Sequence, residues 1–180
     1  SMAIGDFLDD ENKLKPGNFY SHDSVYIVSD KIEHSGIHYK KLPDFMDQMI
    51  RFANEEDNIN DLLKAAMLHF YLGYLHPYFD GNGRMARLIH LWFLIQRGYE
   101  AALFVPFSSY IERSRKAYYN AYSLVEGNYK ISGVMDITPF LLYFIENVYD
   151  KIGNDKKPAE TLEKYKEALK TGEITQKESE

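Results

Sequence analysis

The sequence contains no cysteine, which excludes disulfide bonds and thiolate metal sites. It also lacks long apolar runs: its hydrophobic stretches are far too short to cross a bilayer, and its first residues do not read as a signal peptide. Positive charge is scarce, since 21 Lys and Arg stand against 27 Asp and Glu and the net charge is −6. A general nucleic-acid binder is usually basic. We therefore expect a cytoplasmic protein that binds neither membranes nor nucleic acid directly.

Hydrophobic residues are plentiful, at 45% of 180 residues, and 15% of the residues are aromatic, which is typical of a domain with a sizeable core. Most of the apolar residues recur at the spacing of a helix face. Two short segments rich in β-branched and aromatic residues, Val25 to Val28 and Ile37 to Tyr39, favour a small β-hairpin. The sequence thus predicts an all-α, mainly helical fold with a hairpin before the core helices. The predicted helices are 43–54, 61–75, 84–97, 109–126, 136–152 and 159–170.

One stretch concentrates polar chemistry between two apolar helices. Pro77 cannot continue the helix before it, so His76 is expected at the exposed C-terminal end of that helix. The following Gly81-Asn82-Gly83 permits positive φ angles and can aim successive N–H groups at one anion. The next helix begins there, and its positive end faces the same point.

Charged side chains complete this stretch. Arg84 and Arg87 are three residues apart and share a helix face, and their guanidinium groups suit phosphate oxygens. Asp80 adds the kind of oxygen ligand that Mg²⁺ takes beside phosphates. Read one by one, these features have plainer explanations: a turn, a helix cap and a solvated face. Joined in this order, they favour a phosphate-binding site with a base beside it.

The stretch from His76 to Arg87 resembles the signature of the Fic (filamentation induced by cAMP) domain family, H-P-F-x-[DE]-G-N-G-R-x-x-R. It matches at every fixed position except Tyr78, where Phe is usual. The segment from Gly17 to Tyr20, followed by Val25, is similar to the family's G-x-[FY]-R-x-x-x-V, but has Tyr20 in place of Arg. The resemblance covers residues 17–152 as a Fic domain, between a polar N-terminal segment (1–16) and a charged C-terminal helix and tail (153–180).

The resemblance implies a Fic-type helical bundle and a protein adenylyltransferase, which moves AMP from ATP to a Ser, Thr or Tyr hydroxyl of a target protein and releases pyrophosphate. His76 would be the catalytic base and Asp80 the Mg²⁺ ligand. The hairpin would be the flap on which the target docks, here Lys31 to Tyr39. The residues that would bind the nucleotide are Gly81, Asn82, Gly83, Arg84, Arg87 and Tyr119, the last as an adenine contact.

Several alternatives stay open. A Fic-fold enzyme can use another donor, as a phosphotransferase or a phosphocholine transferase, although the intact Gly81-Asn82-Gly83 speaks for AMP transfer. A non-catalytic nucleotide-binding module of a toxin–antitoxin pair would not need His76. A metal-dependent hydrolase built on His76 and Asp80 lacks further ligands. Many family members carry an inhibitory [ST]-x-x-x-E-[GN] helix, which the sequence lacks, so we expect a separate inhibitor or an upstream helix. Removal of AMP relies on that helix's Glu.

Overall fold

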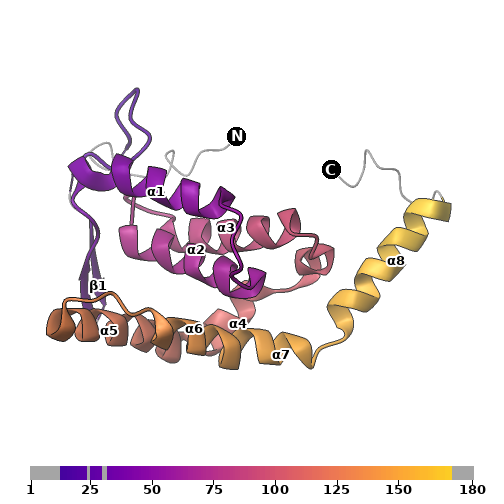
Figure 1. Ribbon diagram of the computed structural model, residues 1–180. Coiled ribbons are helices and arrows are strands. Elements are labelled where there is room, and N and C mark those ends of the chain that lie inside the picture. Colours follow the sequence, from indigo (N-terminus) through magenta and orange to yellow (C-terminus); the bar gives the residue numbers. More distant parts are fainter. Residues whose placement is uncertain (1–12, 24, 30–31, 172–180) are drawn as a thin grey trace. The chain divides into compact units, whose positions relative to one another are not determined.

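The computed structural model describes residues 13–23, 25–29 and 32–171 of the chain (Figure 1). Most of the predicted segment 1–16, Lys31 of the predicted flap and the end of the predicted tail lie outside the described residues. The contacts divide the chain into two compact units, Ser1–Phe93 and Leu94–Glu180, which are described separately below. The prediction of a mainly helical fold is confirmed. Among the described residues, none of the helices has the length and apolar character needed to cross a membrane.

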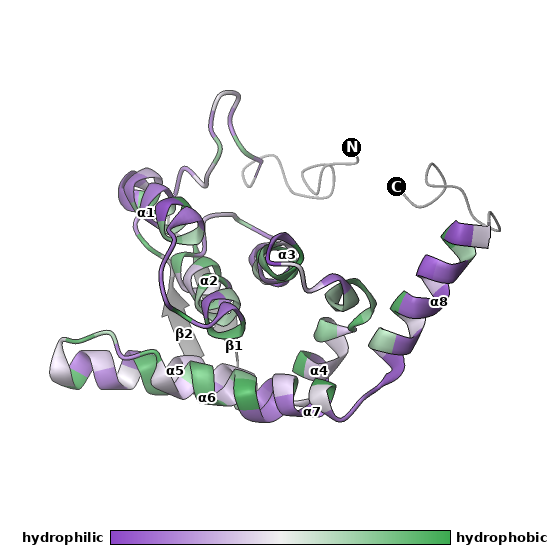
Figure 2. Ribbon diagram, turned by 45° about the vertical axis from the view of Figure 1, so that its right-hand side comes forward, coloured by the Kyte–Doolittle hydropathy of each residue, from purple (hydrophilic) through white to green (hydrophobic). Residues whose placement is uncertain are grey.

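The first unit consists of a hairpin and three helices. The hairpin strands are β1 (Tyr26–Ser29) and β2 (Ile32–Ser35), followed by a short 3-10 helix, η3 (Tyr39–Lys41). The helices are α1 (Leu42–Asn54), α2 (Asp61–Leu75) and α3 (Asn82–Gln96), the last of which continues into the second unit. Figure 2 looks nearly along the axes of these three helices, which lie side by side.

Helix α2 is the core of this unit. Asn60 is its N-cap, and the Asn60 side chain accepts a hydrogen bond from Leu62 N at 3.0 Å. The helix is apolar on most sides, as expected for a helix that is covered by neighbours. Its fully buried residues come from several faces: Lys64, Ala65, Ala66, Leu68, His69 and Phe70.

The hairpin differs in register from its prediction. Strands β1 and β2 pair antiparallel, with Tyr26 opposite Ser35, so the second strand lies earlier in the chain than the predicted Ile37 to Tyr39. Ile37 N instead donates to Leu75 O, and Tyr39 begins η3. The prediction of the second strand was wrong because a short β-like composition does not reveal its hydrogen-bond partner.

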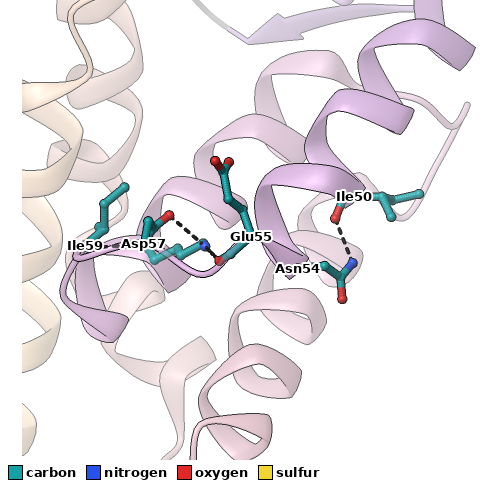
Figure 3. Close-up of polar contacts among 6 residues, drawn as sticks. Ile50, Asn54, Glu55, Asp57 and Ile59 are labelled. Carbon is teal, nitrogen blue, oxygen red and sulfur yellow. Dashed lines mark hydrogen bonds and ion pairs between the residues drawn. The ribbon is translucent and has the colours of Figure 1, made fainter.

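A buried lysine ties the loop after α1 to α2. The Lys64 side chain is 1% exposed, and its Nζ donates to Glu55 O at 2.7 Å and to the Asp57 carboxylate at 2.9 Å. Figure 3 shows Glu55 and Asp57 in this loop. The ammonium also lies 4.9 Å from the ring centre of Phe52 and 5.9 Å from that of Phe93. Its charge is therefore matched by an anion, a carbonyl and two ring faces.

Two buried histidines meet between α2 and α3. His69 is 0% exposed and His90 is 1% exposed, and their ring centres are 6.0 Å apart, edge to face. Burial lowers the pKa of His69 well below its usual value, and the neighbouring His90 and the Arg87 charge lower it further. Burial alone lowers the pKa of His90 to about 3. Both rings are therefore neutral at pH 7 and pack as core residues.

This pair gives the protein a pH-dependent stability. Because the pKa values are lower in the folded than in the unfolded state, the unfolded chain binds more protons as the pH falls below about 6.5. We expect the free energy of unfolding to drop by about 1 kcal/mol per histidine between pH 6.5 and 5.5, above the range in which carboxylates protonate. Urea unfolding at several pH values measures this slope. A His90→Leu variant should show a shallower slope, and an unchanged slope would contradict the assignment.

The second unit is wholly helical in its described part. After the end of α3 comes the 3-10 helix η4 (Glu100–Phe104). It contacts the last helix, α8 (Lys157–Thr171), through the Phe104 and Tyr165 rings and a Lys166–Glu100 ion pair at 2.8 Å. In the sequence between η4 and α8, helix α5 packs against α6 (Figure 1). The remaining elements are α4 (Phe107–Arg113), α5 (Arg115–Ser132), α6 (Thr138–Phe144), the π-helix η5 (Ile145–Tyr149) and α7 (Asp150–Gly153).

The predicted single helix 109–126 is two helices, because the chain breaks at Ser114. The Ser114 hydroxyl donates to Tyr110 O at 2.8 Å and lies 2.7 Å from the Tyr143 hydroxyl of α6. A serine that bonds back to the carbonyl four residues earlier bends a helix. Here Ser114 leaves the helical conformation, with φ −113° and ψ 25°.

Candidate active site

His76 stands at the C-terminal end of α2 in a left-handed conformation, with φ 51° and ψ 56°. It is the single non-glycine residue with positive φ in the part of the chain that the structure describes. Pro77 explains the end of the helix, because the residue before a proline is disfavoured in the right-handed helical region. Left-handed backbone strains a side chain such as histidine, and such strain is often found at functional sites.

The His76 ring is oriented by its own helix. Its Nδ1 lies 3.2 Å from the carbonyl oxygen of Gly73, which can only accept a hydrogen bond. Nδ1 therefore carries the proton in this contact, and the neutral ring keeps its lone pair on Nε2. This is the tautomer that a base acting through Nε2 requires.

Asp80 and Arg84 face each other at the start of α3. Arg84 Nη2 donates to Asp80 Oδ2 at 2.8 Å, and both side chains are more than half exposed. Asp80 Oδ1 accepts from Gly81 N at 2.6 Å. A phosphate or a cation that arrives from solvent can reach both groups, and it would compete with an exposed ion pair that contributes little to stability.

Helix α3 begins beside these groups. Gly81 has φ 85°, a conformation that glycine adopts without strain, and Gly81 O accepts from Met85 N at 2.9 Å as the first bond of the helix. The next amides of a helix N-terminus lack carbonyl partners within the helix, which makes them anion donors. Arg87 Nη1 lies 3.5 Å from the point where a Gly83 side chain would begin, so the Arg87 guanidinium folds back over the same helix end.

The Asn82 side chain holds the loop together. It is buried, and its Oδ1 accepts from Tyr78 N at 2.9 Å while its Nδ2 donates to Tyr78 O at 2.6 Å. These two bonds pin the backbone two residues after His76. A direct contribution of Asn82 to nucleotide binding is therefore limited to its backbone N–H.

We expect Asn82→Ala to lower the free energy of unfolding by about 1–3 kcal/mol, because it removes both bonds of a buried side chain and leaves the part-buried N–H and C=O of Tyr78 without these partners. Urea unfolding measures this change. Asn120→Ala is the matched control, since Asn120 is exposed on α5. Equal stability of the Asn82→Ala and Asn120→Ala variants would show that the two hydrogen bonds between Asn82 and Tyr78 do not hold the loop.

The segment before the hairpin packs on the same loop. Ser21 N donates to Pro77 O at 2.8 Å, and the rings of His22 and Phe79 meet edge to face with centres 5.1 Å apart. Tyr20 and Tyr78, the two departures from the Fic pattern noted above, lie with ring centres 6.4 Å apart. Burial raises the pKa of Tyr78, and the neighbouring Tyr20 adds to the rise. No local sequence pattern indicates that these segments touch, because the residues lie far apart in the chain.

Tyr119, the predicted adenine contact, belongs to the second unit. Its ring packs edge to face on Tyr118, with centres 5.3 Å apart, and the Arg115 guanidinium carbon lies 5.8 Å from its centre. The first unit contains His76, Asp80, Arg84, Arg87 and the loop 81–83. Their joint role in nucleotide binding stays a prediction, as does Tyr119 as an adenine contact.

Asp80 is the candidate ligand for a magnesium ion that would also bind substrate phosphates. Among the described residues no group of three or more His, Asp or Glu is placed to hold a metal ion. Magnesium in proteins commonly takes one or two carboxylates together with substrate phosphates and water. The exposed Asp80 carboxylate, close to the N-terminus of α3, fits this pattern.

Fold and site define a mainly helical protein in which a helix N-terminus with two arginines follows a histidine in the left-handed conformation. The Fic/DOC family model matches residues 2–94, more than half of the chain, and the chain belongs to this family. The fold is that of Fic proteins: a Fic family protein from Desulfovibrio desulfuricans G20 aligns with a TM-score of 0.63 over 76% of this chain and 41% of that chain, at 20% identity. A Fic domain containing signaling protein from Bacteroides thetaiotaomicron aligns with a TM-score of 0.53, over 71% of this chain and 50% of that one, at 20% identity.

Curated relatives agree on the family. The chain is 27% identical over 94 residues to "Protein adenylyltransferase Fic" of Drosophila grimshawi, covering 52% of this chain and 17% of the relative. It is 28% identical over 103 residues to the protein of the same name from Drosophila erecta, covering 56% and 18%. The chain thus spans less than a fifth of the length of these relatives.

Proposed function

We propose that this chain is a protein adenylyltransferase, which transfers AMP from ATP to a hydroxyl group of a target protein. The observation that carries the proposal is the position of His76, with Nδ1 on Gly73 O, next to the loop that opens α3. His76 follows the last residue of α2 and Asn82 begins α3, so the proposed base and the proposed anion-binding helix end flank one short loop. The family membership and the names of the curated relatives support this choice of reaction.

The reaction needs a base for the attacking hydroxyl. The hydroxyl oxygen of the target forms a bond to the α-phosphorus of ATP, the bond from that phosphorus to the bridging oxygen of the β-phosphate breaks, and pyrophosphate leaves. The hydroxyl proton passes to Nε2 of His76, whose Nδ1–H stays on Gly73 O. The resulting imidazolium keeps that hydrogen bond, which becomes stronger when the donor is charged.

The start of α3 holds the phosphates. Backbone amides of Asn82 and Gly83 stabilise the charge on the α-phosphate oxygens. The positive φ angle of Gly81 turns the chain so that these amides face the phosphate. Arg84 and Arg87 hold the β- and γ-phosphates and the departing pyrophosphate. Arg84 gives up the exposed contact with Asp80 when it takes a phosphate oxygen.

Mg²⁺, when bound, neutralises phosphate charge, and Asp80 would hold it together with phosphate oxygens of ATP. In the same proposal, Tyr119 contacts the adenine ring, and its packing on Tyr118 fixes the ring plane. The target hydroxyl arrives on the hairpin around Lys31 to Tyr39. The target adds hydrogen bonds along the hairpin edge, as peptides do on an exposed strand. A separate inhibitor or an upstream helix restrains the enzyme.

Labelled ATP tests the reaction. The protein is incubated with Mg²⁺ and lysate protein, and with ATP that carries label at either the α- or the γ-phosphate. We expect α-label on protein and none from the γ-position. Arg84→Gln should reduce labelling, whereas Arg113→Gln, an exposed arginine of α4, should not.

A Fic-fold transferase with another donor is the second candidate, and the same experiment separates the two. Label from the γ-position alone would assign a phosphotransferase. Absence of label from both positions, in a protein that binds ATP by calorimetry, would favour a nucleotide-binding module or a different donor.

A further inference from the structure

The two chain segments that flank the hairpin donate hydrogen bonds to the residues before and after His76. The segment that enters the hairpin donates from Ser21 N to Pro77 O at 2.8 Å, one residue after His76. The segment that leaves the hairpin donates from Ile37 N to Leu75 O at 3.1 Å, one residue before it. Leu75 O lies in the last turn of α2, where a carbonyl has no partner within the helix. The flanks of the hairpin therefore complete the end of this helix.

Gly36 brings the outgoing segment into direct contact with His76. A side chain at Gly36 would place its first carbon 2.9 Å from His76 Cβ, 3.2 Å from Leu75 O and 3.5 Å from His76 O. Two real carbon atoms do not approach to 2.9 Å without a shift. Gly36 N also donates to Val25 O at 3.0 Å, so the residue is fixed to the hairpin as well as to the helix end. Gly36 is thus glycine for close approach, and the approach is made to the proposed base.

We propose that Gly36 is a positioning residue, which couples the hairpin to His76 and holds the His76 ring in place. The proposal rests on the proposed function for the role of His76. Three contacts carry the coupling: Ser21 with Pro77, Ile37 with Leu75, and Gly36 with the His76 side chain itself. The strained left-handed backbone of His76 makes this support necessary, because an unsupported residue would relax from it. A target strand that binds the hairpin then affects the position of the His76 ring.

The test variant is Gly36→Ala, and Gly127→Ala is its matched control. Gly127 lies inside α5, and a side chain there meets nothing within 4 Å. Two readouts are measured: the NMR resonances of the His76 ring CH groups, which do not depend on activity, and the rate of label transfer from α-labelled ATP. We expect Gly36→Ala to shift the His76 resonances and to slow transfer by about 10- to 100-fold, because small displacements of a catalytic group have effects of this size. ATP affinity by calorimetry should stay within about twofold, since the substitution leaves unchanged the groups at the start of α3 that are proposed to bind the phosphates.

The outcomes separate the two proposals. Wild-type His76 resonances in folded Gly36→Ala would overturn the positioning role, whatever the reaction proves to be. Shifted resonances in a protein whose wild type transfers no AMP would support the coupling and reject the adenylyltransferase. If Gly36→Ala does not fold, hydrogen exchange of the wild type decides. We then expect the amides of Ile37 and Ser21 to be protected together with that of His76, which donates to Leu72 O. Exchange of both at the rate of open amides would overturn the coupling.

Discussion

Replacement of His76 by glutamine is expected to slow AMP transfer by about 10²- to 10⁴-fold, the range that general acid–base catalysis contributes. Glutamine can keep a hydrogen bond to Gly73 O, the partner of His76 Nδ1, but it cannot take a proton from the target hydroxyl. Initial rates with α-labelled ATP measure the loss. Calorimetry should give an unchanged ATP affinity, because the groups proposed to bind the phosphates lie at the start of α3.

Two further substitutions of His76 distinguish its role as a base from the effect of its backbone conformation on stability. His76→Ala and His76→Gly both lack a base, so both should transfer AMP as slowly as His76→Gln. They should differ in stability: glycine adopts the left-handed conformation freely, and we expect the glycine variant to be more stable than the alanine variant by about 1 kcal/mol. Activity of His76→Gln within tenfold of the wild type would contradict the role of His76 as base. Equal stability of His76→Ala and His76→Gly would argue against backbone strain.

The parts of this site that depend on neighbouring residues could be predicted from the sequence. Pro77 predicts the end of α2, and Gly81 predicts a turn with positive φ; the structure has both. The left-handed backbone of His76 itself was not predicted, because histidine rarely adopts it. The direction of the Asn82 side chain was not predicted either, since an asparagine in a loop can bond outward or inward.

The supports of the site come from far along the chain, and no local pattern shows them. Gly36 could be interpreted only as a turn residue, although its close contact is with His76. Likewise, the Ser114 break between α4 and α5 depends on the Tyr143 hydroxyl of α6. The spacing of apolar residues predicts which face of a helix is buried, but it does not identify the residue on the other side of the contact. This explains why the helices were largely predicted while the hairpin register and the helix break were not.

The ion pair between Lys64 and Asp57 should stabilise the first unit, because the Lys64 side chain is 1% exposed and that of Asp57 is 22% exposed. We expect Asp57→Asn to lower the free energy of unfolding by about 1–3 kcal/mol, the cost of leaving a buried polar group short of a partner. The reason is that the Lys64 ammonium, 1% exposed, would keep Glu55 O and two ring faces but lose its anion. Urea unfolding at pH 7 measures the change. Glu112→Gln, in the exposed pair with Arg115 at 3.6 Å, is the control and should leave stability unchanged within error.

Removal of the charge itself should cost less than removal of its partner. Lys64→Met keeps an unbranched apolar stem between Phe52 and Phe93, and it removes the ion that needs Asp57. The double variant Asp57→Asn/Lys64→Met should therefore be more stable than Asp57→Asn alone, since no buried charge is left without an anion. Additive losses in this cycle would mean that Asp57 stabilises the loop independently of Lys64. The same comparison tests whether the loop between α1 and α2 is held mainly by charge or by packing, because packing survives in the double variant and the ion pair does not.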